Sequence, residues 1–136
     1  MDCIFCKIIK KEIPAKIIAE TEKSLAFMDA FPLTKGHSLV IPKTHYEKIQ
    51  DISFEDNADL FETVRKTLAK VDKITNATLV AIHNGKESGQ EIPHVHVHLI
   101  PRRSKDSAGP VHSMFHNAPK LSDNEITELY HKLKES

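Results

Sequence analysis

The seven residues from 94 to 100 alternate between histidine and apolar side chains before ending on two apolar residues. In order they are His94, Val95, His96, Val97, His98, Leu99 and Ile100. Successive side chains of a strand point to opposite faces, so this segment predicts a strand with three imidazoles on one face and an apolar second face. The apolar face needs a core to pack against. The chain is therefore expected to build a sheet that carries a helix on one side.

Periodicity elsewhere predicts an α+β fold. Helical spacing of apolar residues predicts a short helix in Cys3–Lys11, a long one that begins after Ser53 and runs to about Ile74, and a short last one after Ser122. Strands are predicted at Lys16–Glu20, Ser24–Asp29, His37–Ile41, Thr78–His83 and His94–Ile100. Most of the connections are short turns, which favours a mostly antiparallel five-stranded sheet with the long helix on it.

Composition narrows the class of protein. A chain of 136 residues is long enough for one domain, residues 1–136, with one core. Its 19 basic residues balance its 19 acidic residues, which argues against nucleic acid as a partner. No apolar run approaches the ~18 residues of a membrane span, and the N-terminus shows no secretion signal. We therefore expect a cytoplasmic protein without a membrane partner.

The histidine face points to chemistry on phosphorus. Neighbouring imidazoles on one face of a strand lie ~6.6 Å apart and the outer pair ~13 Å apart, too far for all three to share one metal ion. The three histidines are therefore expected to have at least two different roles. A neutral imidazole is a nucleophile at neutral pH, and its neighbours can hold phosphoryl oxygens. A phosphate ester or phosphoramidate substrate is the resulting hypothesis.

The same segment resembles in full the signature of the histidine triad (HIT) superfamily. Further matches to nucleotide-binding members of that superfamily lie at Cys3–Ile9, Glu12–Ala15, Ala26–Asp29, Gly36–Lys43 and Gly89–Gln90. The resemblance covers about residues 3–103. It implies a single domain of HIT-like fold with its core in that range and a variable C-terminal segment, residues 104–136.

The resemblance also implies roles for individual residues. His96 is expected to be the nucleophile that attacks the α-phosphorus, and His98 to contact phosphate and assist the leaving group. Asp29 is expected to accept hydrogen bonds from ribose. Polar contacts to the phosphate or leaving group are expected from Asn84 and Gln90. The purine slot is expected from Ile4, Phe5, Ile8 and Phe27, which plain core packing would also explain.

A metal site is a separate expectation. Cys3 and Cys6 form half of a zinc site, and His45 and His94 are the natural candidates for the other half. Some zinc-containing relatives use such a set, and four protein ligands would make the zinc structural. The alternative is two reduced cysteines with His45 free at the surface.

Several functions stay open at this point. The resemblance favours a hydrolase or transferase that attacks the α-phosphate of a purine nucleotide through a nucleotidyl-histidine intermediate, most simply an adenosine phosphoramidase. The Pro101-Arg102-Arg103 continuation instead resembles dinucleoside polyphosphate hydrolases of the superfamily. A nucleotide-binding scaffold with little turnover and a metal hydrolase with catalytic zinc on His96 and His98 are further alternatives.

Oligomeric state and three other histidines complete the expectations. The resemblance implies a homodimer, with Leu60–Ile74 partly at the interface. His83 could reach the phosphate region or merely end a strand. His112 and His116 could cover the partner's active site or belong to an exposed loop.

Overall fold

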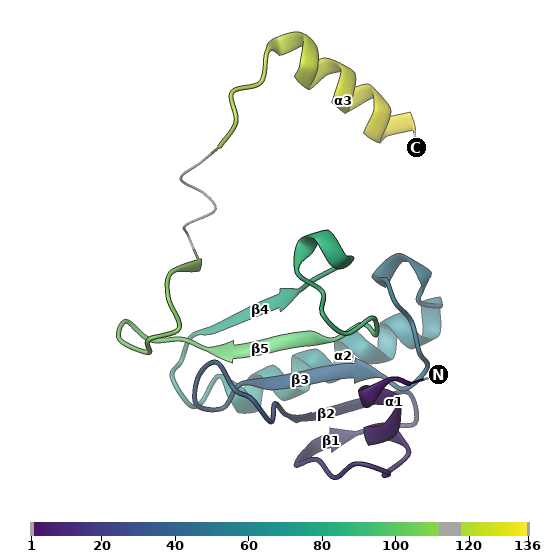
Figure 1. The fold of residues 1–136 in the computed structure, drawn as a ribbon, viewed down its shortest axis with the longest axis vertical. Helices are drawn as coiled ribbons and strands as arrows, with labels where there is room; N and C mark the ends of the chain where they lie inside the picture. Colours follow the sequence, from purple (N-terminus) through teal and green to yellow (C-terminus); the bar gives the residue numbers. More distant parts are fainter. Residues whose placement is uncertain (1, 112–117, 136) are drawn as a thin grey trace.

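A single five-stranded antiparallel sheet organises the chain (Figure 1). The computed structural model describes residues 2–111 and 118–135. In spatial order the strands are β1 (Ile17–Glu20), β2 (Ser24–Met28), β3 (Ser38–Pro42), β5 (Val97–Pro101) and β4 (Thr78–Ile82). All neighbouring pairs are antiparallel, so the α+β prediction with its five-stranded sheet is confirmed.

The two faces of the sheet are covered unequally. The long helix α2 (Phe54–Val71) packs on one face, where Leu60 and Val64 meet the buried Val97 and Leu99. The short helix α1 (Ile4–Ile9) packs on the opposite face through a second apolar cluster that includes Phe5. His98 pairs with Leu39 of that second cluster, which places the histidine face on the α1 side. Because α1 has only six residues, part of this face stays open.

The predicted histidine strand is wrong in its first three residues. Regular pairing in β5 begins at Val97, and residues 94–96 run toward it as irregular chain. The Val95 amide donates to the Tyr46 carbonyl at 2.7 Å, so this stretch pairs with a loop and not with a strand. The alternation still holds, since Val95, Val97 and Leu99 are all buried in the α2 cluster.

The other boundaries differ by small amounts. Helix α1 begins after Cys3 and ends at Ile9, and α2 ends at Val71, three residues before the predicted end. Two short 3₁₀ turns, η1 (Ile49–Asp51) and η2 (Lys86–Ser88), were not predicted from the sequence. Single turns of this kind carry no apolar period of their own.

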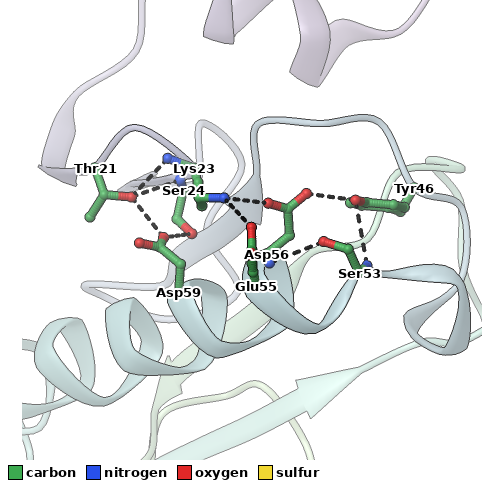
Figure 2. A network of polar contacts seen from close by, with 8 residues as sticks. All are labelled: Thr21, Lys23, Ser24, Tyr46, Ser53, Glu55, Asp56 and Asp59. Carbon is green, nitrogen blue, oxygen red and sulfur yellow. Dashed lines mark hydrogen bonds and ion pairs between the residues drawn. The ribbon is translucent and has the colours of Figure 1, made fainter.

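The N-terminus of α2 is the centre of a polar network (Figure 2). The Ser53 hydroxyl accepts the Asp56 amide hydrogen, which confirms the predicted cap. Tyr46 donates its hydroxyl hydrogen to the Asp56 carboxylate at 2.5 Å. One turn further along α2, Asp59 accepts from the hydroxyls of Thr21 and Ser24. The network therefore ties both the β1–β2 hairpin and the loop around Tyr46 to α2.

The last helix, α3 (Asp123–Glu135), has no buried residue. Its predicted capping box is confirmed, because the Ser122 hydroxyl accepts the Glu125 amide hydrogen while the Glu125 carboxylate accepts the Ser122 amide hydrogen. His112 and His116 lie outside the described residues. None of the described helices combines the length and hydropathy needed to cross a bilayer.

The network predicts a cost for removing one hydroxyl. Tyr46→Phe leaves the partly buried Asp56 carboxylate without its shortest contact, so we expect the free energy of unfolding to fall by about 1–3 kcal/mol. Urea denaturation measures this loss. Tyr130→Phe, on the exposed α3, is the matched control and is expected to change nothing. Equal stabilities of the two variants would contradict the network's role.

Candidate functional site

A cleft of about 400 Å³ opens on the α1 face of the sheet. Apolar side chains form much of its wall, and imidazoles and carboxylates line the rest. The apolar lining comes from Ile4, Phe5, Ile8, Phe27, Ala30, Phe31, Leu33, Leu39 and Ile92, and the polar lining from Asp29, His37, His83, Glu91, His96 and His98. A slightly larger hollow, about 460 Å³ beside Lys35, Arg103 and Lys105, has no imidazole or thiol among the described residues that line it. The nucleophilic groups therefore belong to the histidine cleft.

His96 is held in one tautomer by the backbone. Its Nδ1 lies 2.7 Å from the carbonyl oxygen of His94, and a carbonyl can only accept, so Nδ1 carries the hydrogen. The neutral ring then has its lone pair on Nε2. Burial lowers the pKa of His96 and keeps the ring neutral at physiological pH. His96 thus presents an unprotonated nitrogen in the cleft.

His98 is held in the opposite tautomer by a chain of two hydrogen bonds. The Leu33 amide donates to Nδ1 of His37 at 3.0 Å, so His37 carries its hydrogen on Nε2. That nitrogen donates to Nδ1 of His98 at 3.0 Å, which leaves the hydrogen of His98 on Nε2. Burial and the neighbouring His96 lower the pKa of His98 to about 4. Neutral His98 is therefore a hydrogen-bond donor next to the lone pair of His96.

Asp29 stands where a sugar could be bound. One carboxylate oxygen accepts the Phe31 amide hydrogen at 2.9 Å, and the other lies 3.5 Å from Nε2 of His37. The carboxylate lines the cleft and retains acceptor capacity there. Asp29 is thus placed as predicted for a ribose contact, a role that stays a prediction.

The expected purine slot is a wall of the same cleft. The rings of Phe5 and Phe27 meet edge to face at 5.9 Å, and Phe5 meets His96 at 5.0 Å. Phe5, Ile8 and Phe27 also belong to the apolar cluster under α1. These side chains therefore pack in the core and also face a cleft large enough for a ligand, so the structure is compatible with both interpretations of the sequence.

Four further side chains converge beneath α1. Cys6 Sγ lies 3.4 Å from Nδ1 of His45, Cys3 Sγ lies 3.5 Å from Nδ1 of His94, and the two imidazole nitrogens are 3.1 Å apart. Ligand atoms around a tetrahedral Zn²⁺ are separated by about 3.3–3.8 Å, given bonds of about 2.0–2.3 Å. The set therefore fits zinc, and both cysteines are free thiols.

A hydrogen bond to a backbone carbonyl leaves the His94 ring in the tautomer that a metal ligand on Nδ1 needs. Its Nε2 lies 2.8 Å from the Pro42 carbonyl oxygen and must donate to it, so the lone pair is on Nδ1, among the sulfur atoms. Burial lowers the pKa of His94 to about 4, which keeps the ring neutral. The prediction that His94 and His96 have different roles agrees with their opposite tautomers.

Comparisons with known proteins agree with this geometry. A model of the HIT domain matches residues 10–105. An adenosine 5'-monophosphoramidase of Saccharomyces cerevisiae is 47% identical over 105 residues, covering 77% of this chain and 65% of that protein. The chain belongs to the HIT family. An uncharacterized HIT-like protein of Methanocaldococcus jannaschii is 44% identical over 105 residues, which cover 76% of this chain and 81% of that protein.

The family also contains close structural neighbours. The crystal structure of a histidine triad nucleotide-binding protein from Candida albicans superposes with a TM-score of 0.82 at 35% identity. That superposition covers 98% of this chain and 96% of the other. The described fold is therefore the HIT fold over nearly its whole length.

Two residues that were predicted to contact the nucleotide, Asn84 and Gln90, do not line the histidine cleft. The Asn84 side chain accepts from the Ile49 amide at 2.9 Å and donates to Gln50 at 3.0 Å. Gln90 accepts from the Gly85 amide at 2.8 Å and donates to the Glu47 carbonyl at 2.9 Å. Both amides thus brace the loop after β4, and neither lines the cleft. The contacts predicted for Asn84 and Gln90 with the phosphate or leaving group stay predictions, and both side chains have protein partners in this structure.

The residue that reaches the cleft is the neighbour of Asn84. His83 lines it, with its ring centroid 5.5 Å from that of His98. Ala81 pairs with His98, and His83, two residues further along, falls on the same side of the sheet. The signal in the sequence was the alternation of side chains along β4, which places His83 on the cleft side of the sheet and Asn84 on the opposite side.

Buried neutral imidazoles predict a pH-dependent stability. The unfolded chain protonates His98 near the ordinary value of about 6.5, while the folded chain does so only near a pKa of about 4. The unfolded state therefore binds more protons between these values, and the free energy of unfolding falls as pH falls through this window. Between pH 7 and pH 5, His98 accounts for a loss of up to about 2 kcal/mol. Urea denaturation at both pH values measures it.

Two variants make this test specific. His98→Asn is expected to reduce the loss of stability on acidification, whereas His131→Asn, on the exposed α3, is expected to leave it unchanged. An unchanged pH dependence in His98→Asn would contradict the assignment.

Proposed function

We propose that this HIT protein is a nucleotidyl hydrolase that acts on the α-phosphate of a purine nucleotide, with adenosine phosphoramidates as its substrates. The observation that carries the proposal is the hydrogen bond from Nδ1 of His96 to the His94 carbonyl, which leaves the Nε2 lone pair for attack. The similarity to the yeast adenosine 5'-monophosphoramidase supports the choice of a phosphoramidate.

The reaction has two balanced steps. In the first, Nε2 of His96 forms a bond to the α-phosphorus while the bond from phosphorus to the leaving nitrogen breaks, and that nitrogen takes up one proton from bulk water. In the second, a water oxygen bonds to phosphorus as the bond to His96 breaks. The proton that this water loses returns to bulk water, so His96 ends as it began, with Nε2 unprotonated. The Nε2–H of His98 can donate to a phosphoryl oxygen in both steps, where charge develops.

The alternatives have less support in the geometry. Of the two arginines in the continuation that suggested a dinucleoside polyphosphate hydrolase, Arg102 donates to the Asp106 carboxylate and the Gly109 carbonyl. A catalytic zinc on His96 and His98 would need a lone pair from both rings in the cleft, and the lone pair of His98 is on Nδ1, which already accepts from His37. A scaffold with little turnover would not need opposite tautomers on neighbouring rings. Covalent catalysis by His96 uses the opposite tautomers of His96 and His98 directly.

We also propose a structural Zn²⁺ on Cys3, Cys6, His45 and His94. Four protein ligands leave no open position, so the ion would take no part in the reaction. It would join α1 to the loop after β3 and to the chain before β5. Free thiols of this kind persist in reducing compartments, which supports a cytoplasmic location.

A homodimer is the third part of the proposal, and the edge strand β4 supports it. All five of its residues are at least partly exposed, and Val80 is 43% exposed on the α2 side of the sheet. An apolar edge strand promotes association unless it is covered. The partial interface predicted on Leu60–Ile74 stays part of this proposal, because Leu60, Val64 and Val71 are buried within the chain while Phe61 and Ile74 are exposed.

Covalent catalysis predicts a trapped intermediate. Mixing the protein with an adenosine phosphoramidate is expected to add one adenylyl group transiently, seen by intact-protein mass spectrometry. His96→Ala is expected to lose the adduct and at least about a thousandfold of turnover, while His131→Ala keeps both. Turnover that survives in His96→Ala would contradict the mechanism.

The zinc proposal predicts about one ion per chain in protein purified without chelators. Removing it with a chelator is expected to lower Tm by about 10 °C, as for a ligand held near 100-fold above its Kd. Turnover well below that temperature is expected to continue. Absence of zinc from the native sample, or immediate loss of turnover with the fold intact, would contradict a structural ion.

The dimer is tested by sedimentation. Wild type is expected to sediment with twice the chain mass, and Val80→Lys, which places a charge on the apolar edge, is expected to sediment as a monomer. Glu87→Lys, on exposed η2, is the control and should stay dimeric. A monomeric wild type would rule out the interface.

A further inference from the structure

Among the described histidines that line the cleft, His83 neither takes part in the proposed reaction nor orients another ring, as His37 does for His98. It follows β4 directly and lines the cleft together with His96 and His98. Its ring meets that of His98 nearly at right angles, with centroids 5.5 Å apart. A partly exposed imidazole at this place needs either a structural or a ligand-binding explanation.

The loop after β4 fixes the ring of His83. Nδ1 lies 2.7 Å from the Ser88 carbonyl oxygen and must donate to it, so the neutral ring has its lone pair on Nε2. The carbonyl itself is held in a tight turn, since the Ser88 amide and hydroxyl both donate to the Gly85 carbonyl. Nε2 of His83 is thus an oriented hydrogen-bond acceptor.

Gly89 makes room for this ring. Its φ of +106° is unfavourable for other residues, and a Cβ there would lie 3.0 Å from Nδ1 of His83. The turn therefore combines the carbonyl that orients the imidazole with the one residue type that lets it pack so closely.

The order of rings shows which part of a substrate His83 would meet. Phe5 lies 5.0 Å from His96, His96 lies 4.9 Å from His98, and His98 lies 5.5 Å from His83. If the base occupies the wall at Phe5 and the α-phosphorus faces His96, the group that departs from phosphorus lies toward His98 and His83. The acceptor nitrogen of His83 is therefore at the leaving-group end.

We propose that His83 is a specificity-determining residue whose Nε2 accepts a hydrogen bond from the N–H of the leaving group. The preferred substrates are then adenylates joined through nitrogen to a group that carries its own N–H, such as a primary amine. This inference rests on the proposed function. The contact uses a hydrogen that the leaving nitrogen already carries in the bound substrate, so it forms before the leaving group is protonated.

Two substrates with the same phosphorus–nitrogen bond test this contact. One is an adenosine 5'-phosphoramidate of a primary amine, whose nitrogen carries a hydrogen. The other is adenosine 5'-phosphoromorpholidate, whose nitrogen carries none. Values of kcat/KM are compared at about pH 8, where an ordinary imidazole is neutral.

His83→Phe keeps a ring but removes the acceptor. It is expected to lower kcat/KM about tenfold for the primary-amine substrate and less than twofold for the morpholidate. His83→Gln, which restores an acceptor oxygen, is expected to recover most of the difference. His131→Phe is the control on exposed α3 and should change neither value.

The outcomes separate this inference from the proposed function. Equal losses on both substrates would show a purely structural role for His83 and overturn the inference, as would no loss on either. In both cases wild-type turnover and the adduct on His96 would still support the function. If wild type formed no adduct and turned over neither substrate, the function would fail and the inference with it.

Discussion

Two hydrogen bonds to backbone carbonyls determine what the central histidines can do. His94 donates from Nε2 to Pro42, and His96 donates from Nδ1 to His94 itself. The two rings are only two residues apart, yet their lone pairs lie on different nitrogens. The lone pair on Nδ1 of His94 lies near the two sulfur atoms and His45, and the lone pair on Nε2 of His96 faces the cleft. The separation between the metal-binding role proposed for His94 and the nucleophilic role proposed for His96 therefore depends on the irregular chain before β5.

This dependence explains why residues 94–96 do not pair as a regular strand. In a regular ladder the His94 carbonyl would bond a neighbouring strand. Here it accepts from the His96 side chain, while Val95 pairs with the loop at Tyr46. That loop also carries His45 and is fastened to α2 through Asp56 (Figure 2). The proposed metal ligands, the proposed nucleophile and the long helix thus belong to one connected unit.

Much of the fold could be predicted because its signals are local. Alternation in residues 94–100, the cap at Ser53 and the box at Ser122 each depend on a few neighbouring residues, and each holds in the structure. The start of β5 could not be predicted, because it depends on a hydrogen bond to a loop about 50 residues away. The convergence of Cys3, Cys6, His45 and His94 was predicted from residue type and from the resemblance, and it agrees with the geometry.

The least predictable part was the loop after β4. Asn84 has the residue type expected to contact phosphate, but side chains of neighbouring residues in extended chain point to opposite sides. Ile82 packs on the α2 side, so His83 falls on the cleft side and Asn84 does not. Residue type alone favoured Asn84 as the side chain that reaches the cleft, whereas the alternation along β4 favours His83. Membership of the family did not decide between the two, because they are adjacent in the sequence and a shift of one residue exchanges their sides.

The central claim is that the backbone fixes the tautomer of His96, and nitrogen-15 NMR of histidine-labelled protein tests it most directly. At neutral pH the account predicts a His96 ring with Nδ1 protonated and Nε2 unprotonated. A ring with its hydrogen on Nε2, or one that exchanges freely between the two forms, would contradict the account.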